Sequence, residues 1–268
     1  MDGFDFCEMP VAVHRATVAG RDLQFWAAAR QADLPLEMEE VSEVSKLLPE
    51  DFNDDSILNS MCACIFDTVP ALCWRLSREA FTGKALELGS GMGLPGLWLA
   101  SAGAHVVLTD CHPGVLRLLQ LNVDLNGLQG RAEVKALRWE DRPLWLTGFD
   151  LVIGSDILQL DCKEPAGGAV FALRQSVGYE IAGFRLFKAA ACALRPGGRL
   201  VLANTIRGAS VGVAAIQQHA ASAGLCLNGC VDAAVGEVAV FEFEKLDRVV
   251  PSCEHSCGES KHACCRRL

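Results

Sequence analysis

Apolar and polar positions change their spacing several times along the 268 residues, and each spacing predicts a type of element. Residues 9–26 alternate partly between apolar and polar side chains around Gly20, which predicts two strands joined as a hairpin. Residues 33–60 are acidic and irregular, so we expect a linker or an insertion there. From residue 59 to residue 78 the apolar side chains recur at helical spacing, and Thr82-Gly83 ends that helix.

From residue 84 onward, short apolar runs alternate with segments of helical spacing. Strands that alternate with helices form a mostly parallel sheet covered by helices on both faces. The pattern therefore predicts an α/β fold of the doubly wound kind. Strands are expected at 84–88, 105–110, 132–137, 149–156, 199–203 and 238–244, and helices at 94–102, 113–126, 179–194 and 211–223.

The composition narrows the possible partners and compartments. Hydrophobic residues make up 51% of the chain, charged residues 21%, and the formal net charge is −9. An acidic chain gains little from phosphate contacts, so nucleic acid is disfavoured as a partner and a basic protein substrate is favoured. No apolar run approaches the ~20 residues that span a bilayer, and the acidic N-terminus lacks the features of a secretory signal. The 13 cysteines stand mostly singly in apolar segments. We expect a protein of the cytoplasm or the nucleus with no membrane partner.

A glycine-rich turn follows the first strand of the main body. Residues 89–93 read Gly-Ser-Gly-Met-Gly, and glycine allows both positive φ angles and the close approach of a cofactor. Glu87 stands at the end of the strand, where a carboxylate suits an ammonium or sulfonium group better than a pyrophosphate. Asp110 ends the second strand, where a carboxylate can accept both hydroxyls of a ribose.

The same turn also fits a second interpretation. Residues 91–96, GMGLPG, satisfy the G-x-G-x-x-G fingerprint of dinucleotide-binding proteins, and Asp110 would serve NAD equally well. Glu87 argues against this reading because its charge would repel a pyrophosphate above the turn. A nicotinamide-dependent oxidoreductase stays open as an alternative.

Together these residues resemble a known family. Residues 86–96, LELGSGMGLPG, are similar to the L-E-L-G-x-G-x-G-L-x-G signature of class I methyltransferases, and especially of methyltransferase family 16, which holds many protein-lysine methyltransferases. Residues 134–139, VKALRW, resemble the L-x-W segment of that family. Residues 149–156, FDLVIGSD, resemble its F-D-x-I-x-x-[AS]-D strand, and Phe66-Asp67 stands where the family has Trp followed by Pro or Asp. The resemblance covers roughly residues 9–245.

The resemblance implies a Rossmann-like sheet of seven strands with one antiparallel strand, and S-adenosylmethionine as cofactor. It implies that Glu87 and the glycines hold the methionine end, Asp110 the ribose and Trp139 the adenine. Glu140 or Asp141 would then lie near the adenine amino group. By residue type alone, Trp139 suits the protein core equally well. The full set implied for the cofactor is Glu87, Gly89, Gly91, Gly93, Asp110, Trp139 and Ser155, with Asp156 as the catalytic residue at the methyl-transfer site.

The substrate expectation meets one departure from the family. Lysine-modifying members usually carry an aromatic residue three positions after the aspartate, and here that position is Gln159. Either another aromatic residue restores the wall of the pocket, or the acceptor is not lysine, or activity has been lost. The candidates to restore it are Tyr179, Phe171 and Phe184. A protein lysine is the favoured acceptor; a small molecule, a nucleic acid or a non-catalytic binding role are the alternatives.

We expect three parts along the chain. Residues 1–58 form an N-terminal hairpin with an acidic linker, residues 59–246 the methyltransferase domain, and residues 247–268 a flexible tail rich in cysteine. The tail carries Cys253, Cys257 and His262, but their spacing matches no closed zinc module, so no metal is expected.

Overall fold

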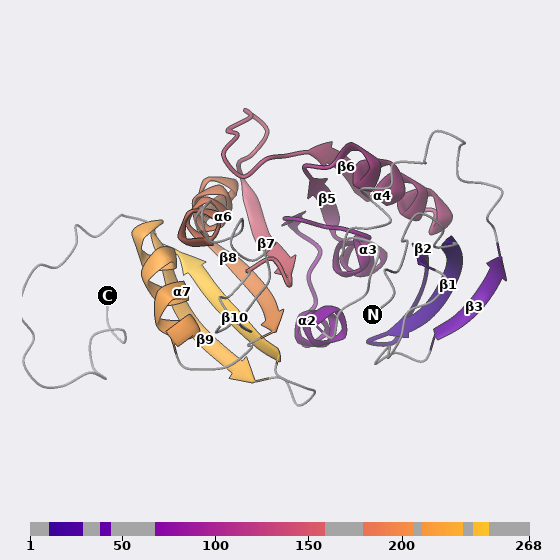
Figure 1. The fold of residues 1–268 in the computed structure, drawn as a ribbon, viewed down its shortest axis with the longest axis horizontal. Coiled ribbons are helices and arrows are strands. Elements are labelled where there is room, and N and C mark those ends of the chain that lie inside the picture. Colours follow the sequence, from indigo (N-terminus) through magenta and orange to yellow (C-terminus); the bar gives the residue numbers. More distant parts are fainter. Residues whose placement is uncertain are drawn as a thin grey trace, which may run out of the picture.

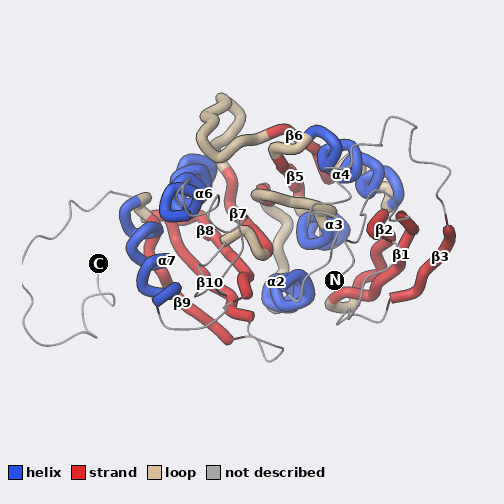
Figure 2. Tube along the Cα trace, viewed as in Figure 1, coloured by secondary structure: helices blue, strands red, loops and turns tan. Residues whose placement is uncertain are grey.

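A computed structural model describes residues 11–28, 38–43, 68–158, 179–205, 211–232 and 238–246. Within these ranges the main sheet has seven strands in the order β6-β5-β4-β7-β8-β10-β9 (Figures 1 and 2). Its strands are β4 (Lys84–Glu87), β5 (His105–Asp110), β6 (Ala132–Ala136), β7 (Phe149–Ser155), β8 (Leu194–Thr205), β9 (Leu225–Asp232) and β10 (Val238–Lys245). The helices are α2 (Thr68–Ser77), α3 (Leu94–Ser101), α4 (Pro113–Leu125), α6 (Tyr179–Ala193) and α7 (Val211–Ser222).

The pairing of the strands agrees with the expected sheet. Strands β4 to β8 pair with one another in parallel, and β10 runs antiparallel to both β8 and β9. The predicted seven-stranded, mostly parallel sheet with one antiparallel strand is therefore confirmed.

The side chains of neighbouring residues in each strand point to opposite faces of the sheet. Ala85 belongs to the cluster under α2, α3 and α4, whereas Leu86 belongs to the cluster under α6 and α7. The two groups of helices lie on opposite sides of the sheet (Figure 1). This alternation explains why the strands are apolar at nearly every position: both of their faces are covered.

The N-terminal hairpin is also confirmed, as β1 (Val11–Val18) and β2 (Arg21–Ala28). It packs on α3 and α4 through the buried side chains of Val18, Leu23 and Phe25. The Trp98 indole of α3 donates a hydrogen bond to the Val18 carbonyl oxygen over 2.8 Å.

The chain course differs from the expectation at two strands. The expected linker contains a strand, β3 (Met38–Glu43), which pairs antiparallel with β1. Its acidic, weakly apolar sequence carries no strand pattern of its own. The strand forms because pairing with β1 satisfies its backbone hydrogen bonds. The edge strand β9 was also missed, since Asn228 and Gly229 interrupt its apolar pattern next to a register shift against β10.

The chain reverses its direction of winding between β4 and β7. The path from β4 leads through α3 to β5 on one side, and β7 leads through α6 to β8 on the other. In open α/β sheets this switch leaves a crevice beyond the carboxyl ends of the two strands, where ligands bind. The helix expected from residue 59 is described from Thr68 onward, and residues 59–67 lie outside the described part. Among the described helices, none is long and apolar enough to cross a membrane.

Candidate functional site

The glycine turn beyond β4 takes a backbone course that only glycine adopts easily. Gly89, Gly91 and Gly93 have φ angles of +59°, +52° and +77°. Space is short as well: a methyl group on Gly89 would lie 2.9 Å from Ile157, and one on Gly93 would lie 2.5 Å from Leu119. Both backbone conformation and packing therefore require glycine in this turn.

Hydrogen bonds from β5 hold the turn in place. The Thr109 hydroxyl donates to the Glu87 carbonyl oxygen over 2.6 Å, and the Thr109 N–H donates to the Ser90 hydroxyl over 2.9 Å. The Ser90 N–H in turn donates to the Thr109 carbonyl oxygen over 2.8 Å. These bonds join the ends of β4 and β5, so the turn and Asp110 form one unit.

Asp110 ends β5 directly beside the turn. Its Oδ2 atom accepts a hydrogen bond from the Gly91 N–H over 3.3 Å, and its Oδ1 atom accepts one from the His112 N–H over 3.0 Å. The side chain is only half-buried. A carboxylate oriented in this way at the end of the second strand suits ribose hydroxyls.

Glu87 lies deeper than the sequence suggested. The residue is 1% exposed, and its Oε2 atom has no hydrogen-bond partner. A methyl group on Gly96 would lie 2.6 Å from that oxygen, so the carboxylate is directed toward the first turn of α3. Burial raises the pKa of the Glu87 carboxyl to about 8, against the opposing effect of Ser90 and the Gly96 N–H. Glu87 is thus brought to the site, but beneath the turn.

Trp139 lies on the other side of the turn. A methyl group on Gly89 would be 3.7 Å from Trp139 Cζ2 and 2.9 Å from Ile157 Cγ2, so both side chains flank Gly89. Trp139 is partly buried and packs on the cluster under α6 and α7. It therefore contacts both the core and the edge of the turn. Of the two acidic residues that follow it, Glu140 forms an ion pair with Arg185 over 3.7 Å.

Ser155 and Asp156 form a corner at the end of β7. Asp156 has a φ angle of +53°, a conformation that residues other than glycine seldom adopt. Its N–H donates to the Ala203 carbonyl oxygen over 2.8 Å, and its Oδ1 atom accepts from the Thr205 N–H over 3.3 Å. The Ser155 hydroxyl donates to the Thr68 hydroxyl over 2.8 Å. Thr68 was missed in the sequence, which offered no signal for it within the helix expected from residue 59.

These residues share one edge of the sheet because they end neighbouring parallel strands. Other expected positions cannot be placed. Gln159, Phe171, Phe66-Asp67 and the cysteine-rich tail lie outside the described residues, and so do the side chains of Tyr179 and Phe184. In the described part of the chain, no group of three His, Cys, Asp or Glu side chains is arranged to hold a metal ion.

Two hollows of the described chain lie near the opposite edge of the sheet. One is lined by residues at the amino ends of β4, β5 and β6, including Lys84, His105 and Arg131. The other lies between the hairpin turn at Gly20 and the residues that follow α2. Neither includes a residue of the glycine turn.

Comparison with known proteins indicates the kind of cofactor that this edge of the sheet binds. The sequence profile of a family described as lysine methyltransferase matches residues 17–163, which is more than half of the 268 residues. The chain belongs to the lysine methyltransferase family. The expected membership is therefore confirmed, and with it S-adenosylmethionine as the cofactor of the family. The glycine turn, the half-buried Asp110 and the unpaired buried carboxylate oxygen of Glu87 fit a cofactor that carries a ribose and a cationic end.

Named lysine methyltransferases share part of this sequence. Protein N-lysine methyltransferase METTL21A of Danio rerio is 37% identical over 114 residues, which cover 40% of this chain and 52% of the relative. EEF1A lysine methyltransferase 3 of Mus musculus is 37% identical over 110 residues, covering 39% and 47%. Calmodulin-lysine N-methyltransferase of Arabidopsis thaliana is 35% identical over 122 residues, covering 40% of each. The chain thus spans about half the length of the curated relatives it matches, or less.

A solved structure supports the fold alone. The [4+2]-cyclase SpnF superposes with a TM-score of 0.52 at 12% identity, over 66% of this chain and 80% of the cyclase. Its name describes a different reaction, which illustrates that the shape of the family fold does not by itself define the chemistry.

Proposed function

We propose that this chain is an S-adenosylmethionine-dependent methyltransferase that methylates a lysine side chain of a protein. One observation carries the proposal: the positive-φ glycine turn and Asp110 are joined by the Gly91 N–H to Asp110 bond at the switch point of a methyltransferase-family sheet. Membership of the lysine methyltransferase family and the relatives named as lysine methyltransferases support the reaction and the acceptor.

The residues around the turn suggest how this chain would hold the cofactor. Gly89, Gly91 and Gly93 would let the backbone turn sharply beneath the cofactor, and Asp110 would accept the ribose hydroxyls. Trp139, beside Gly89, would provide the apolar surface for the adenine. Glu87 would act from beneath the turn, where a buried carboxylate favours a cation above it.

At the end of β7, Ser155 and Asp156 would border the reacting groups. S-adenosylmethionine, when bound, supplies a methyl group that is activated on a sulfonium. The chain itself has to position the acceptor and exclude water. A lysine amine, with an ordinary pKa of ~10.4, has to lose its proton before it can attack, and an apolar pocket favours the neutral form. Asp156 would orient the amine and would not serve as a strong base.

The net charge of the chain bears on the substrate class and the compartment that we propose. A chain with a net charge of −9 suits a basic protein substrate in the cytoplasm or the nucleus. The relatives are named for different protein substrates, EEF1A and calmodulin among them. We further propose that residues 59–246 carry the methyltransferase domain and that the N-terminal hairpin precedes it; the cysteine-rich residues 247–268 lie outside the described part of the chain.

Calorimetric titration tests the cofactor site directly. We expect the purified chain to bind S-adenosylmethionine and S-adenosylhomocysteine with micromolar affinity, and Asp110→Ala to weaken both by at least tenfold because the ribose loses its acceptor. NADH serves as the control for the dinucleotide alternative and should give no heat. Absence of binding to either methionine-derived ligand would contradict the proposed function.

One feature supports a second candidate, a non-catalytic binding protein of the same family. Gln159 replaces the aromatic residue that usually follows the aspartate in lysine-modifying members. Incubation of the chain with a protein lysate and tritiated S-adenosylmethionine distinguishes the two candidates. Labelled lysine supports the enzyme, whereas cofactor binding without any labelled protein supports the binding protein.

A further inference from the structure

Thr68, the first residue of α2, is a buried polar residue whose hydroxyl meets that of Ser155. The residue is 0% exposed, and its Oγ1 atom accepts a hydrogen bond from the Ser155 hydroxyl over 2.8 Å. The two residues are 87 positions apart in the sequence. Two apolar side chains could fill the same space without desolvating two hydroxyls. The hydrogen bond between the two hydroxyls instead fixes the direction in which the Ser155 oxygen points.

The backbone beyond Ser155 is held on its other side by β8. Ser155 stands in register with Ala203, whose carbonyl oxygen accepts the Asp156 N–H over 2.8 Å. The next turn is held by the Asn204 side chain, which accepts the Leu158 N–H over 2.9 Å. Asp156 has its unusual φ angle of +53° within this set of contacts. Thr68 is the contact that comes from the opposite element, α2.

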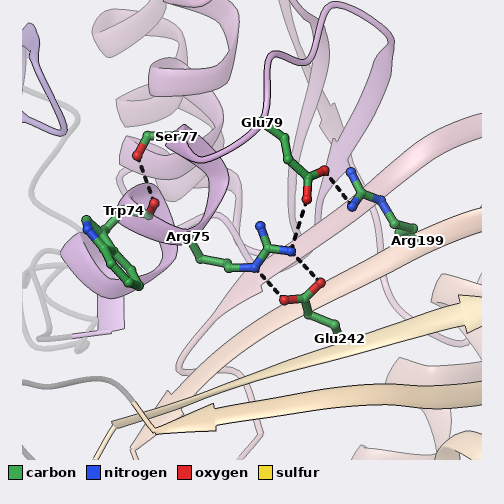
Figure 3. A network of polar contacts seen from close by, with 6 residues as sticks. All are labelled: Trp74, Arg75, Ser77, Glu79, Arg199 and Glu242. Atoms are coloured by element: carbon green, nitrogen blue, oxygen red, sulfur yellow. Dashed lines mark hydrogen bonds and ion pairs between the residues drawn. The ribbon is translucent and has the colours of Figure 1, made fainter.

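Helix α2 is itself fixed to the sheet at its far end (Figure 3). Arg75 makes a two-pronged ion pair with Glu242 of β10, in which Arg75 Nη2 lies 2.7 Å from Glu242 Oε2. Arg75 also contacts Glu79, which pairs with Arg199 of β8 over 2.8 Å. Trp74 points away from these pairs in the same view and is exposed. The ion pairs limit sliding or rotation of α2, so Thr68 meets Ser155 in one position.

We infer that Thr68 is a positioning residue of the methyl-transfer site, whose buried hydroxyl holds Ser155 and the Ser155–Asp156 corner in the geometry that binds the cofactor. The inference rests on the proposed function. Thr68 acts through Ser155 and need not touch cofactor or acceptor.

Two variants separate the hydroxyl from the packing. Thr68→Val keeps the shape of the side chain and removes the hydroxyl, whereas Thr68→Ser keeps the hydroxyl and removes the methyl group. In the protein without ligand, we expect the hydrogen-bonded Asp156 and Leu158 amides of Thr68→Val to exchange about tenfold faster, with the amides of α7 unchanged. Calorimetry should show S-adenosylmethionine affinity reduced about tenfold in Thr68→Val and within twofold of the original in Thr68→Ser.

A double-mutant comparison tests whether Thr68 works through Ser155. Ser155→Ala alone and Thr68→Val with Ser155→Ala should lose the same affinity, because the second change removes a contact that is already absent. Additive losses, or a Thr68→Val protein with unchanged exchange and unchanged affinity, would overturn the inference while leaving the proposed function intact. An original chain that binds no S-adenosylmethionine would overturn both. The two failures are therefore distinguishable.

Discussion

At the scale of single residues, the environment of a side chain decides its chemistry more than its type does. Glu87 and Asp110 are both acids that end neighbouring strands. Asp110 is half-buried and accepts two backbone hydrogen bonds, whereas Glu87 is fully buried with one oxygen unpaired. Desolvation favours the protonated form of Glu87, so its charge depends on what lies above the turn.

The stability of the chain should therefore carry a pH dependence that arises from Glu87. The folded state holds the Glu87 proton with a pKa of about 8, above the usual 4.5, so this contribution is complete below pH 4.5 and is lost as the pH rises toward 8. Between pH 5.5 and 7.5 we expect the free energy of unfolding of Glu87→Gln to fall less than that of the original chain, by roughly 2 kcal/mol. Urea titrations at the two pH values measure the difference. Equal changes in both proteins would show that Glu87 is ionised in the folded state.

Glycines that share a backbone conformation should differ in their tolerance of alanine. Gly93 and Gly148 have φ angles of +77° and +76°, but a methyl group on Gly93 would lie 2.5 Å from Leu119, and one on Gly148 would meet nothing within 4 Å. Gly148→Ala should lower the free energy of unfolding by ~1 kcal/mol, and Gly93→Ala by ~2 kcal/mol more, because only Gly93 also lacks space. Denaturant titration of both variants measures this. Equal losses would contradict the packing argument.

At the scale of elements, α2 connects parts of the molecule that are distant in sequence. Its apolar side packs on the sheet through Val69, Leu72 and Leu76, and Arg75 on its charged side pairs with Glu242 of β10. Glu79, just after the helix, links Arg75 to Arg199 of β8. The hydrogen bond from Ser155 of β7 reaches its first residue, Thr68. A single helix therefore contacts three central strands, and its position affects the end of each.

Removal of the Arg75–Glu242 pair should cost more than removal of an exposed pair. The Arg75 and Glu242 side chains are 16% and 18% exposed, compared with 54% and 31% for Arg195 and Asp150. Arg75→Met should lower the free energy of unfolding by ~2 kcal/mol, because Glu242 keeps a half-buried charge, while Arg195→Met should cost under ~1 kcal/mol. Thermal and urea unfolding of both variants provide the comparison. A loss in Arg195→Met equal to that in Arg75→Met would contradict it.

At the scale of the whole molecule, the N-terminal hairpin extends the core on the side of α3 and α4. Asn126, after α4, accepts the Gln24 N–H over 2.9 Å and donates to the Gln24 carbonyl oxygen over 2.5 Å. Arg21 donates to the Ser101 carbonyl oxygen over 2.8 Å and lies above the Trp98 ring. The hairpin is thus held to α3 and α4 by polar contacts at defined points as well as by apolar packing.

Loss of the Asn126 amide should loosen the hairpin locally. Asn126→Ala leaves both backbone groups of Gln24 without this partner, so we expect the β1 and β2 amides to exchange at least tenfold faster in hydrogen–deuterium exchange. The amides of α7 and β10, on the far side of the sheet, serve as the internal control. Uniformly faster exchange throughout the protein would indicate global destabilisation and contradict the prediction.

Local features of the site could be predicted because residues close together in the sequence determine them. The run from Leu86 to Gly96 specifies a strand, a turn that requires glycine and a helix, and Asp110 follows at the end of the next strand. The doubly wound sheet follows from the same alternation of spacings. These properties depend on backbone sterics and on periodicity, which act over a few residues.

The tertiary structure alone decided what depends on contacts between distant segments. Whether Glu87 meets water or the interior depends on α2 and α3, which cover it. Whether Thr68 belongs to the site depends on a contact with a residue 87 positions away. Strand β3 exists because β1 offers it an edge, although its own sequence resembles a linker. The sequence by itself thus determined the fold class and the glycine turn, whereas packing across the sheet decided which polar groups are buried together, because such pairings leave no local pattern.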